Sequence, residues 1–228
     1  MKGDIPMKLL FKLVPFLLVF AFGLYLAGCV NLEQKTTLNN DGSGSMKIKY
    51  WTKSSNVSGD ELAGFGFTDE KVKSNYTSSS TETSNIKIEK NTTDDSLITV
   101  TLDVKFKDLN KLSDAKAFSK IKASWAKGKD GMDFKYTLLQ DTSNAKQMGM
   151  SDYKLTYEFD FAGEVLSTNG KKDGQKVNWN KTVADLKEDV DLTATIKSGK
   201  KCGLFGFELP IVILFGMTLM YGIRKRKK

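Results

Sequence analysis

The sequence contains no histidine, only 3 prolines and only 2 cysteines in its 228 residues. Histidine is the commonest general base and metal ligand, so its absence removes the usual partner of a serine or cysteine nucleophile. The two cysteines, Cys29 and Cys202, both lie outside the middle of the chain, which excludes structural zinc and internal disulfides from that region. These absences predict a protein that is not an enzyme and that uses no metal or cofactor.

The net charge of +8 is concentrated at the two ends of the chain. Residues 30–200 contain 26 Lys and no Arg against 25 Asp and Glu, so this region is almost neutral. The excess lies in Lys2, Lys8 and Lys12 and in the terminal IRKRKK. Such placement is typical of the cytoplasmic ends of membrane segments. We therefore expect a membrane as a partner, and no nucleic acid.

The first apolar run covers residues 9–26, LLFKLVPFLLVFAFGLYL, and ends at AGC. A basic start, an apolar run and small residues before the cut are typical of a secretory signal, which begins at Met1 or Met7. Leu26-Ala27-Gly28-Cys29 also resembles the lipobox of bacterial lipoproteins. This resemblance implies that residues 1–28 are a lipoprotein signal peptide and that Cys29 carries a diacylglycerol. An uncleaved N-terminal membrane helix is the alternative.

The second apolar run, residues 203–223, would span roughly 30 Å as a helix, about one hydrocarbon core. We expect a transmembrane helix there, with the basic tail 224–228 in the cytoplasm. Glu208 lies near the outer end, where it can reach the headgroups; a functional carboxylate within the membrane is the alternative. Cys202, at the boundary, is a free thiol or an acylation site. The domain between the two runs, residues 29–200, is therefore expected on the outer face of the cytoplasmic membrane.

Strict alternation of apolar and polar residues is the strongest pattern in the middle of the chain. It predicts strands with one buried and one solvated face. These strands cover residues 46–50, 86–88, 98–106, 134–138, 153–161, 177–179 and 192–196. Turn sequences separate them, and the hairpin pairs are Asn40-Asp41-Gly42, Asp130-Gly131, Asn169-Gly170 and Asp173-Gly174. The pattern favours an antiparallel sheet built from hairpins, either open or partly closed.

One segment changes to a helical period. Asp108 can cap a helix through Ile121, whose apolar stripe is formed by Leu109, Leu112, Ala115, Phe118 and Ile121. Residues 182–189 are a second, weaker helix candidate. The predicted fold class is therefore α+β, with one or two helices packed on the sheet and a C-terminal transmembrane helix.

Residues 53–84 form a long excursion from the sheet pattern. Ser- and Thr-rich flanks surround Leu62, Phe65 and Phe67, with Gly64 and Gly66 between them. Two interpretations stay open. The stretch is either a mobile apolar flap that touches lipid or covers a cavity, or a short helix or loop packed on the core. The first interpretation makes Leu62, Phe65 and Phe67 the candidate ligand contacts.

Two polar clusters could suggest a metal site. Asn39 to Gly44 offers a single carboxylate and lacks the distant bidentate Glu of a calcium loop, so a hairpin turn is expected. Asp185, Glu188, Asp189 and Asp191 could bind a hard cation, but they are expected in a solvated loop.

The order of the parts resembles the LppM-type family of membrane-anchored lipoproteins. The resemblance rests on the lipobox, the following NLEQKTTLNNDGSGSMKIKYW, the FAGEVLSTNGKKDGQKVNWN block of residues 161–180 and the final apolar segment with its basic tail. It implies a mixed α/β, lipid-binding-like domain outside the cytoplasmic membrane, with glycolipid binding as the suggested activity. No binding motif can be transferred residue by residue.

Two functional hypotheses follow. In the first, a non-enzymatic envelope lipoprotein binds a lipid or glycolipid in a cavity between sheet and helix, because a domain tethered beside a bilayer meets amphiphiles at high local concentration. In the second, a sheet edge or the loop with Phe65 and Phe67 docks a partner protein, whose identity the sequence does not indicate.

Overall fold

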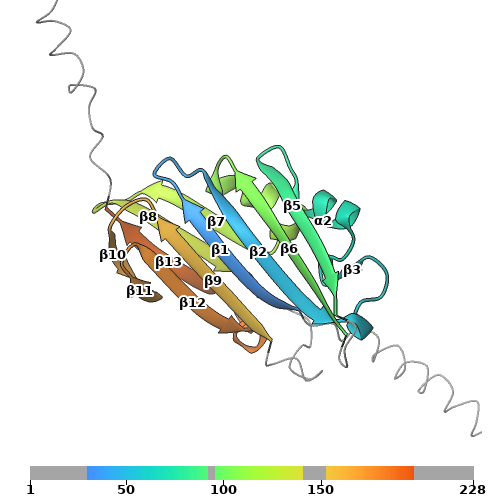
Figure 1. Cartoon of the computed structure of the whole chain (residues 1–228). Coiled ribbons are helices and arrows are strands. Elements are labelled where there is room, and N and C mark those ends of the chain that lie inside the picture. Colours follow the sequence, from blue (N-terminus) through green and yellow to red (C-terminus); the bar gives the residue numbers. More distant parts are fainter. Residues whose placement is uncertain (1–29, 92–95, 141–152, 198–228) are drawn as a thin grey trace, which may run out of the picture. The chain divides into compact units, whose positions relative to one another are not determined.

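The computed structural model describes residues 30–91, 96–140 and 153–197, which form two packed β-sheets and a few short helices (Figure 1). The elements of the first half are β1 (Asn31–Leu38), β2 (Gly44–Lys53), η2 (Ser54–Asn56), β3 (Glu61–Leu62), β4 (Phe65–Gly66), α2 (Asp69–Tyr76), β5 (Thr81–Lys90) and β6 (Leu97–Phe106). Those of the second half are η3 (Leu109–Asp114), η4 (Lys116–Phe118), β7 (Ile121–Lys127), β8 (Met132–Leu138), β9 (Lys154–Phe161), β10 (Val165–Thr168), β11 (Lys171–Asp173), β12 (Lys176–Thr182), η5 (Val183–Asp185) and β13 (Val190–Ile196). The η elements are 3₁₀ helices.

The large sheet has seven strands in the order β11-β12-β9-β1-β2-β6-β5. Its neighbours are antiparallel except β1 and β9, which are parallel from Leu32 beside Leu155 to Leu38 beside Phe161. The prediction of an antiparallel sheet was therefore wrong at its centre. Most of the domain lies between these two strands in sequence, so no hairpin constrains their relative direction. The domain is mostly β with a mixed sheet, where the sequence predicted α+β.

The small sheet, in the order β10-β13-β8-β7, packs against part of the large one. Its Phe134 ring lies 4.6 Å from that of Phe159 and 5.2 Å from that of Phe161, both on β9. The alternation predicted from sequence is confirmed in β8 and β13. Their inward-facing residues are buried in this shared core, namely Phe134, Tyr136, Leu138, Leu192, Ala194 and Ile196. Aromatic rings from both sheets fill the space between them.

The turn at Asn169-Gly170 joins the two sheets. It was predicted as a hairpin, but β10 belongs to the small sheet and β11 to the large one. The Asn169 side chain accepts hydrogen bonds from Trp179 Nε1 (2.8 Å) and from the Thr193 backbone N–H (2.9 Å). It thereby links β12 in the large sheet to β13 in the small one. The other three predicted turns do close hairpins.

The helix predicted from Asp108 to Ile121 is absent, and η3 and η4 replace it. Asp108 does cap the first turn, because its carboxylate accepts from the Asn110 backbone N–H at 3.0 Å. Extended backbone at Ala115 separates the two turns, and from Ile121 onward the chain pairs with β8. Strand pairing thus overrides local helical periodicity. The buried side chains are nevertheless the predicted ones, Leu109, Leu112, Ala115 and Phe118.

The other helical expectations need similar corrections. Residues 182–189 form only the short η5, closed by a capping box between Thr182 and Asp185. The α-helix α2 lies instead within the 53–84 excursion. Among the described residues, no helix is long and apolar enough to cross a membrane. The predicted signal peptide, Cys29, Cys202 and the segment 203–223 with Glu208 lie outside the described residues.

Candidate functional site

A cover segment, residues 54–77, packs on the inner face of the large sheet. It comprises η2, the β3–β4 hairpin and α2. The hydroxyl of Thr68 caps α2 by accepting from the Lys71 backbone N–H at 3.4 Å. Val72 and Tyr76, one helical turn apart, are both buried. Figure 1 shows α2 beside β5, at the edge of the sheet away from β11 and β12.

Aromatic rings join the cover segment to the sheet. The ring of Tyr50, on the inner face of β2, lies 4.9 Å from that of Phe65, 5.6 Å from that of Phe67 and 6.4 Å from that of Tyr76. Phe118 of η4 completes this group with an edge contact to Tyr76 at 5.6 Å. The contact between the cover segment and the sheet is thus made by large, flat apolar surfaces.

The three predicted ligand contacts all lie in the β3–β4 region. Phe67 is buried, while Leu62 and Phe65 are partly buried against the core. These contacts agree with the interpretation in which the excursion packs on the domain as a short helix and loop. The expectation that these side chains contact a ligand stays a prediction.

Polar contacts also hold the cover segment in place. Glu61 forms ion pairs with Lys71 at 2.8 Å and with Lys116 at 3.0 Å, the second of which reaches η4. The hydrogen bonds from Lys71 and then Lys116 hold the pKa of Glu61 below its ordinary value. Within the segment, Asn75 Nδ2 donates to the Gly64 carbonyl at 3.0 Å, and the Tyr50 hydroxyl donates from β2 to the Gly66 carbonyl.

A second group of polar side chains lies in the interior, on strand β1. Gln34 and Thr36 are only 3% and 2% exposed, although glutamine and threonine usually face solvent. Gln34 Nε2 donates to Thr36 Oγ1 at 3.1 Å, and the Tyr136 hydroxyl of β8 donates to Gln34 Oε1 at 3.3 Å. Polar groups converge here inside an otherwise apolar core.

Four buried tyrosines, Tyr50, Tyr76, Tyr136 and Tyr157, form a tyrosine cluster around this group. Burial raises the pKa of each of them, since the phenolate form is poorly solvated there. The pKa of Tyr76 is raised further by the proximity of the other three. The cluster therefore combines residues from β2, α2, β8 and β9, and it connects the cover segment to the small sheet.

Sequence reasoning missed Gln34, Thr36 and the tyrosine cluster as a site. A signal was available, because Leu32, Gln34, Thr36 and Leu38 occupy alternate positions of one strand. Two polar residues at the inward positions of a strand indicate either a buried hydrogen-bond network or a binding site. The tyrosines could not be found this way, because only the tertiary fold brings their four elements together.

The acidic residues near position 190 have structural partners. Asp191 accepts from Thr137 Oγ1 at 2.7 Å and pairs with Lys135 at 2.8 Å, while Asp189 accepts from the Gln140 backbone N–H at 2.8 Å. In the β1–β2 turn, Asp41 accepts from both the backbone and the hydroxyl of Ser43. No group of three or more Cys, Asp or Glu side chains within the described ranges is placed to hold a metal ion.

These features define a mostly β domain with two packed sheets, a helix-bearing cover and a polar group in an aromatic interior. The model of the LppM domain family matches residues 32–198, and the chain belongs to that family. The resemblance expected from the sequence is therefore confirmed.

Among solved structures, the chain is similar to the folded domain of LppM from Mycobacterium tuberculosis, determined by NMR. The two share 14% identity and a TM-score of 0.43, over 75% of this chain and 91% of that one. Comparison with curated proteins gave no significant match.

Proposed function

We propose that this protein is a membrane-anchored lipoprotein of the cell envelope whose domain binds a lipid or glycolipid beneath the cover segment. An acyl group on Cys29 and a membrane span at residues 203–223 attach the domain to the outer face of the cytoplasmic membrane, with residues 224–228 in the cytoplasm. The lipobox and the apolar run with its basic tail support this topology.

The observation that carries the binding proposal is the polar group within the aromatic interior. Lipid and cofactor sites are lined mainly by apolar and aromatic side chains, with a few placed polar groups that fix orientation. Here Tyr50, Phe65 and Phe67 offer the aromatic surface. Gln34 and Tyr136 offer hydrogen-bond partners for the ester or hydroxyl oxygens of an amphiphile.

Entry occurs where the cover segment meets the sheet. The cover is held partly by ion pairs of Glu61, whose lysine partners are 35% and 56% exposed, and such exposed pairs contribute little stability. The tip of its hairpin has left-handed backbone at Ala63 and Gly64, at φ of 50° and 90°. Movement of this segment uncovers Tyr50 and exposes the segment's own Tyr76, whereas the rings between the two sheets belong to the strand core. The cover is thus the region that opens at least cost.

The test uses the full chain, extracted from bacterial membranes in polymer discs without detergent. Native mass spectrometry and lipid extraction are expected to find an amphiphile bound to the wild-type domain and less of it bound to Gln34→Leu. Thr137→Val is the matched control, because Thr137 is also a buried polar residue but hydrogen-bonds Asp191, outside the polar group. A wild-type chain that carries no lipid, and takes up none from excess vesicles, would refute the binding proposal.

A further inference from the structure

The two ends of the described domain lie at opposite ends of its strands. Val30 directly precedes β1, whereas Lys197 directly follows β13. The Lys197 backbone N–H donates to the Glu164 carbonyl, three residues after the end of β9 at Phe161. Because β9 runs parallel to β1, Lys197 lies at the Leu38 end. Figure 1 shows β1 starting at one end of the domain and β13 finishing at the other. The eight residues of β1 alone extend over roughly 25 Å.

The connections from these ends to the predicted anchors are short. Cys29 directly precedes Val30, and only residues 198–202 lie between Lys197 and the apolar segment. Fully extended, that connector reaches at most about 20 Å. If the strands stood upright on the bilayer with Val30 at its surface, Lys197 would be too far away for the segment 203–223 to enter the membrane. Two anchors therefore exclude strands that stand upright on the bilayer and favour strands inclined toward its surface.

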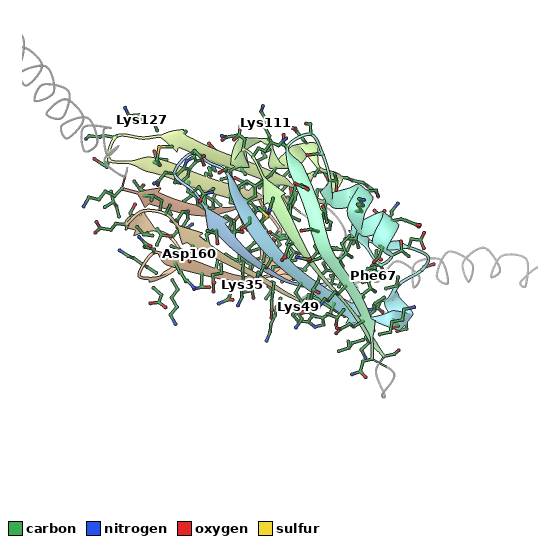
Figure 2. The ribbon with its side chains drawn as sticks, turned by 45° about the horizontal axis from the view of Figure 1, so that its top comes forward. Lys35, Lys49, Phe67, Lys111, Lys127 and Asp160 are labelled. Carbon is green, nitrogen blue, oxygen red and sulfur yellow. The ribbon has the colours of Figure 1, made fainter. Side chains whose placement is uncertain are left out.

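The outward face of the large sheet carries exposed lysines and a tryptophan along this direction, with carboxylates between them. Lys35 of β1 and Lys47 of β2 are direct cross-strand neighbours, and like charges in this arrangement repel each other. On their other sides, Lys35 lies opposite Glu158 and Lys47 opposite Asp103. Within the described ranges, neither ammonium group has a carboxylate at ion-pair distance. The nearby acids have other partners, since Asp103 accepts from Asn85 at 2.7 Å and Glu158 lies 3.9 Å from Lys176. Figure 2 shows Lys35, Lys49 and Asp160 along one side of the molecule and Lys111 and Lys127 along the other.

Two further features of this face fit a lipid surface. Trp51 is outward-facing on β2, and the Lys49 ammonium lies 5.1 Å from the centroid of its ring. Tryptophan and lysine together are typical of the membrane interface. A shallow hollow of about 420 Å³ lies nearby, and its charged lining residues are Lys47, Lys87 and Asp103. Leu97, 38% exposed, lies at the end of β6 nearer to the start of β1.

The outward face of the small sheet differs in its charge pairing. There Lys135 is paired with Asp191 at 2.8 Å, and Asp133 accepts from Thr195 at 3.2 Å. Lys135, Asp133 and Asp191 are thus partnered within the sheet. The unpaired lysines of the large sheet have no such partners, so an anionic surface has more to gain by contacting them.

We propose that the outward face of the large sheet, centred on Lys35, Lys47, Lys49 and Trp51, rests on the anionic headgroups of the bilayer to which the chain is anchored. The inference depends on the two anchors of the proposed function, but not on a lipid bound beneath the cover. The domain lies on its side, the lysines contact phosphate groups and Trp51 reaches the interface. The cover segment, on the other side of the large sheet, then stays accessible.

The test places a fluorescent label on one introduced cysteine in the full-length Cys202→Ser chain, whose Cys29 thiol is blocked by its acyl group. The chain is reconstituted in vesicles of phosphatidylcholine with phosphatidylglycerol. Ser45→Cys lies on the proposed face and Ser124→Cys on the outward face of the small sheet, and both serines are exposed. The label at position 45 is expected to be quenched by headgroup nitroxides and protected from aqueous iodide, and the label at 124 to behave oppositely. Equal quenching at both sites, quenching at neither, or the reverse order would overturn the proposal.

A charge series identifies the contact chemically. Neutralising Lys35 and Lys47 to Gln is expected to lower the membrane-facing population about fivefold for each lysine. The same change at Lys122 and Lys127 of β7 serves as the matched control and should have little effect. If neutralising Lys35 and Lys47 lowered the membrane-facing population no more than neutralising Lys122 and Lys127, the electrostatic contact would be refuted. The mass of the N-terminal peptide shows separately whether Cys29 is lipidated, and native mass spectrometry shows whether a lipid is bound beneath the cover segment. A missing acyl group or a missing bound lipid is therefore distinguishable from a sheet face that does not contact the membrane.

Discussion

Replacement of Gln34 by leucine tests whether the interior polar group is an interacting unit. Gln34 is 3% exposed, and its Oε1 accepts from the Tyr136 hydroxyl at 3.3 Å. Gln34→Leu leaves that hydroxyl buried without its acceptor, which costs about 1–3 kcal/mol of unfolding free energy. Tyr136→Phe leaves the glutamine carbonyl without its donor and is expected to cost a similar amount.

The double variant is expected to be much less destabilised than the sum of the two single variants. Replacing both partners by apolar groups of similar shape leaves neither side of the Gln34–Tyr136 hydrogen bond unsatisfied. The loss of the Gln34 contact to Thr36 Oγ1 is common to Gln34→Leu and the double variant, so it cancels in the comparison. The expected coupling is therefore about 1–3 kcal/mol, within the range seen for contacting pairs.

Urea unfolding of the full chain in mild detergent, followed by the fluorescence of the buried Trp125 and Trp179, measures this cycle. A pair outside the contact, Gln34→Leu with Thr137→Val, serves as the control and should be additive. If Gln34→Leu and Tyr136→Phe were also additive, the hydrogen bond between them would contribute nothing. The proposed polar recognition of a ligand would then lose its structural basis.

Three further predictions concern the cover, the tyrosines and a turn. Hydrogen bonds from its two lysines lower the pKa of Glu61 from 4.5, so the carboxylate stabilises the cover segment above that pH, and this contribution is lost as the pH falls through the lower folded pKa. The rate of hydrogen exchange in residues 54–77 should therefore rise on acidification in the wild type and rise less in Glu61→Gln. Equal responses of the two chains would contradict the assignment. The pKa of Tyr157 and of the other buried tyrosines is raised in the folded chain, so the free energy of unfolding should fall as the pH rises past the tyrosine pKa of the unfolded chain, near 10. Ultraviolet titration should show these tyrosines ionising only when the chain unfolds. Free ionisation of all tyrosines in the folded chain would refute their burial. Gly44→Ala places a Cβ against the Thr37 carbonyl oxygen and should lower the free energy of unfolding, measured in urea, by about 1–3 kcal/mol. Gly174→Asn is the control, because Gly174 has left-handed backbone and open space around it. Similar losses in both variants would exclude the proposed clash.

Most of the strands could be predicted because their information is local. In β9, every second residue from Leu155 to Phe161 is apolar, and the structure buries all four of them. The buried residues around η3 were also predictable, since their apolar spacing survives the change from an α-helix to 3₁₀ turns. The local pattern could not predict where the helical stretch ends, because from Ile121 onward the chain pairs with β8 and this pairing competes with helix formation.

The candidate site was predictable only in part. Phe65 and Phe67 were recognised from their unusual setting among Gly, Ser and Thr, but their partner Tyr50 was assigned only to a strand. Gln34 could have been flagged by its inward position in β1. Its hydrogen bond with Tyr136 joins residues 102 positions apart in sequence, and no local pattern encodes such a contact.

The sequence by itself determined the near-neutral middle region, the apolar runs at both ends, the strand periods and three of the hairpin turns, because each depends on neighbouring residues along the chain. Only the tertiary structure decided that β1 and β9 run parallel, that the cover segment packs on Tyr50, and that four tyrosines meet around Gln34. It also decided that the two ends of the described domain lie at opposite ends of the strands. These features arise from pairing and burial between distant segments, whose free energy depends on the whole fold and not on any one stretch of sequence.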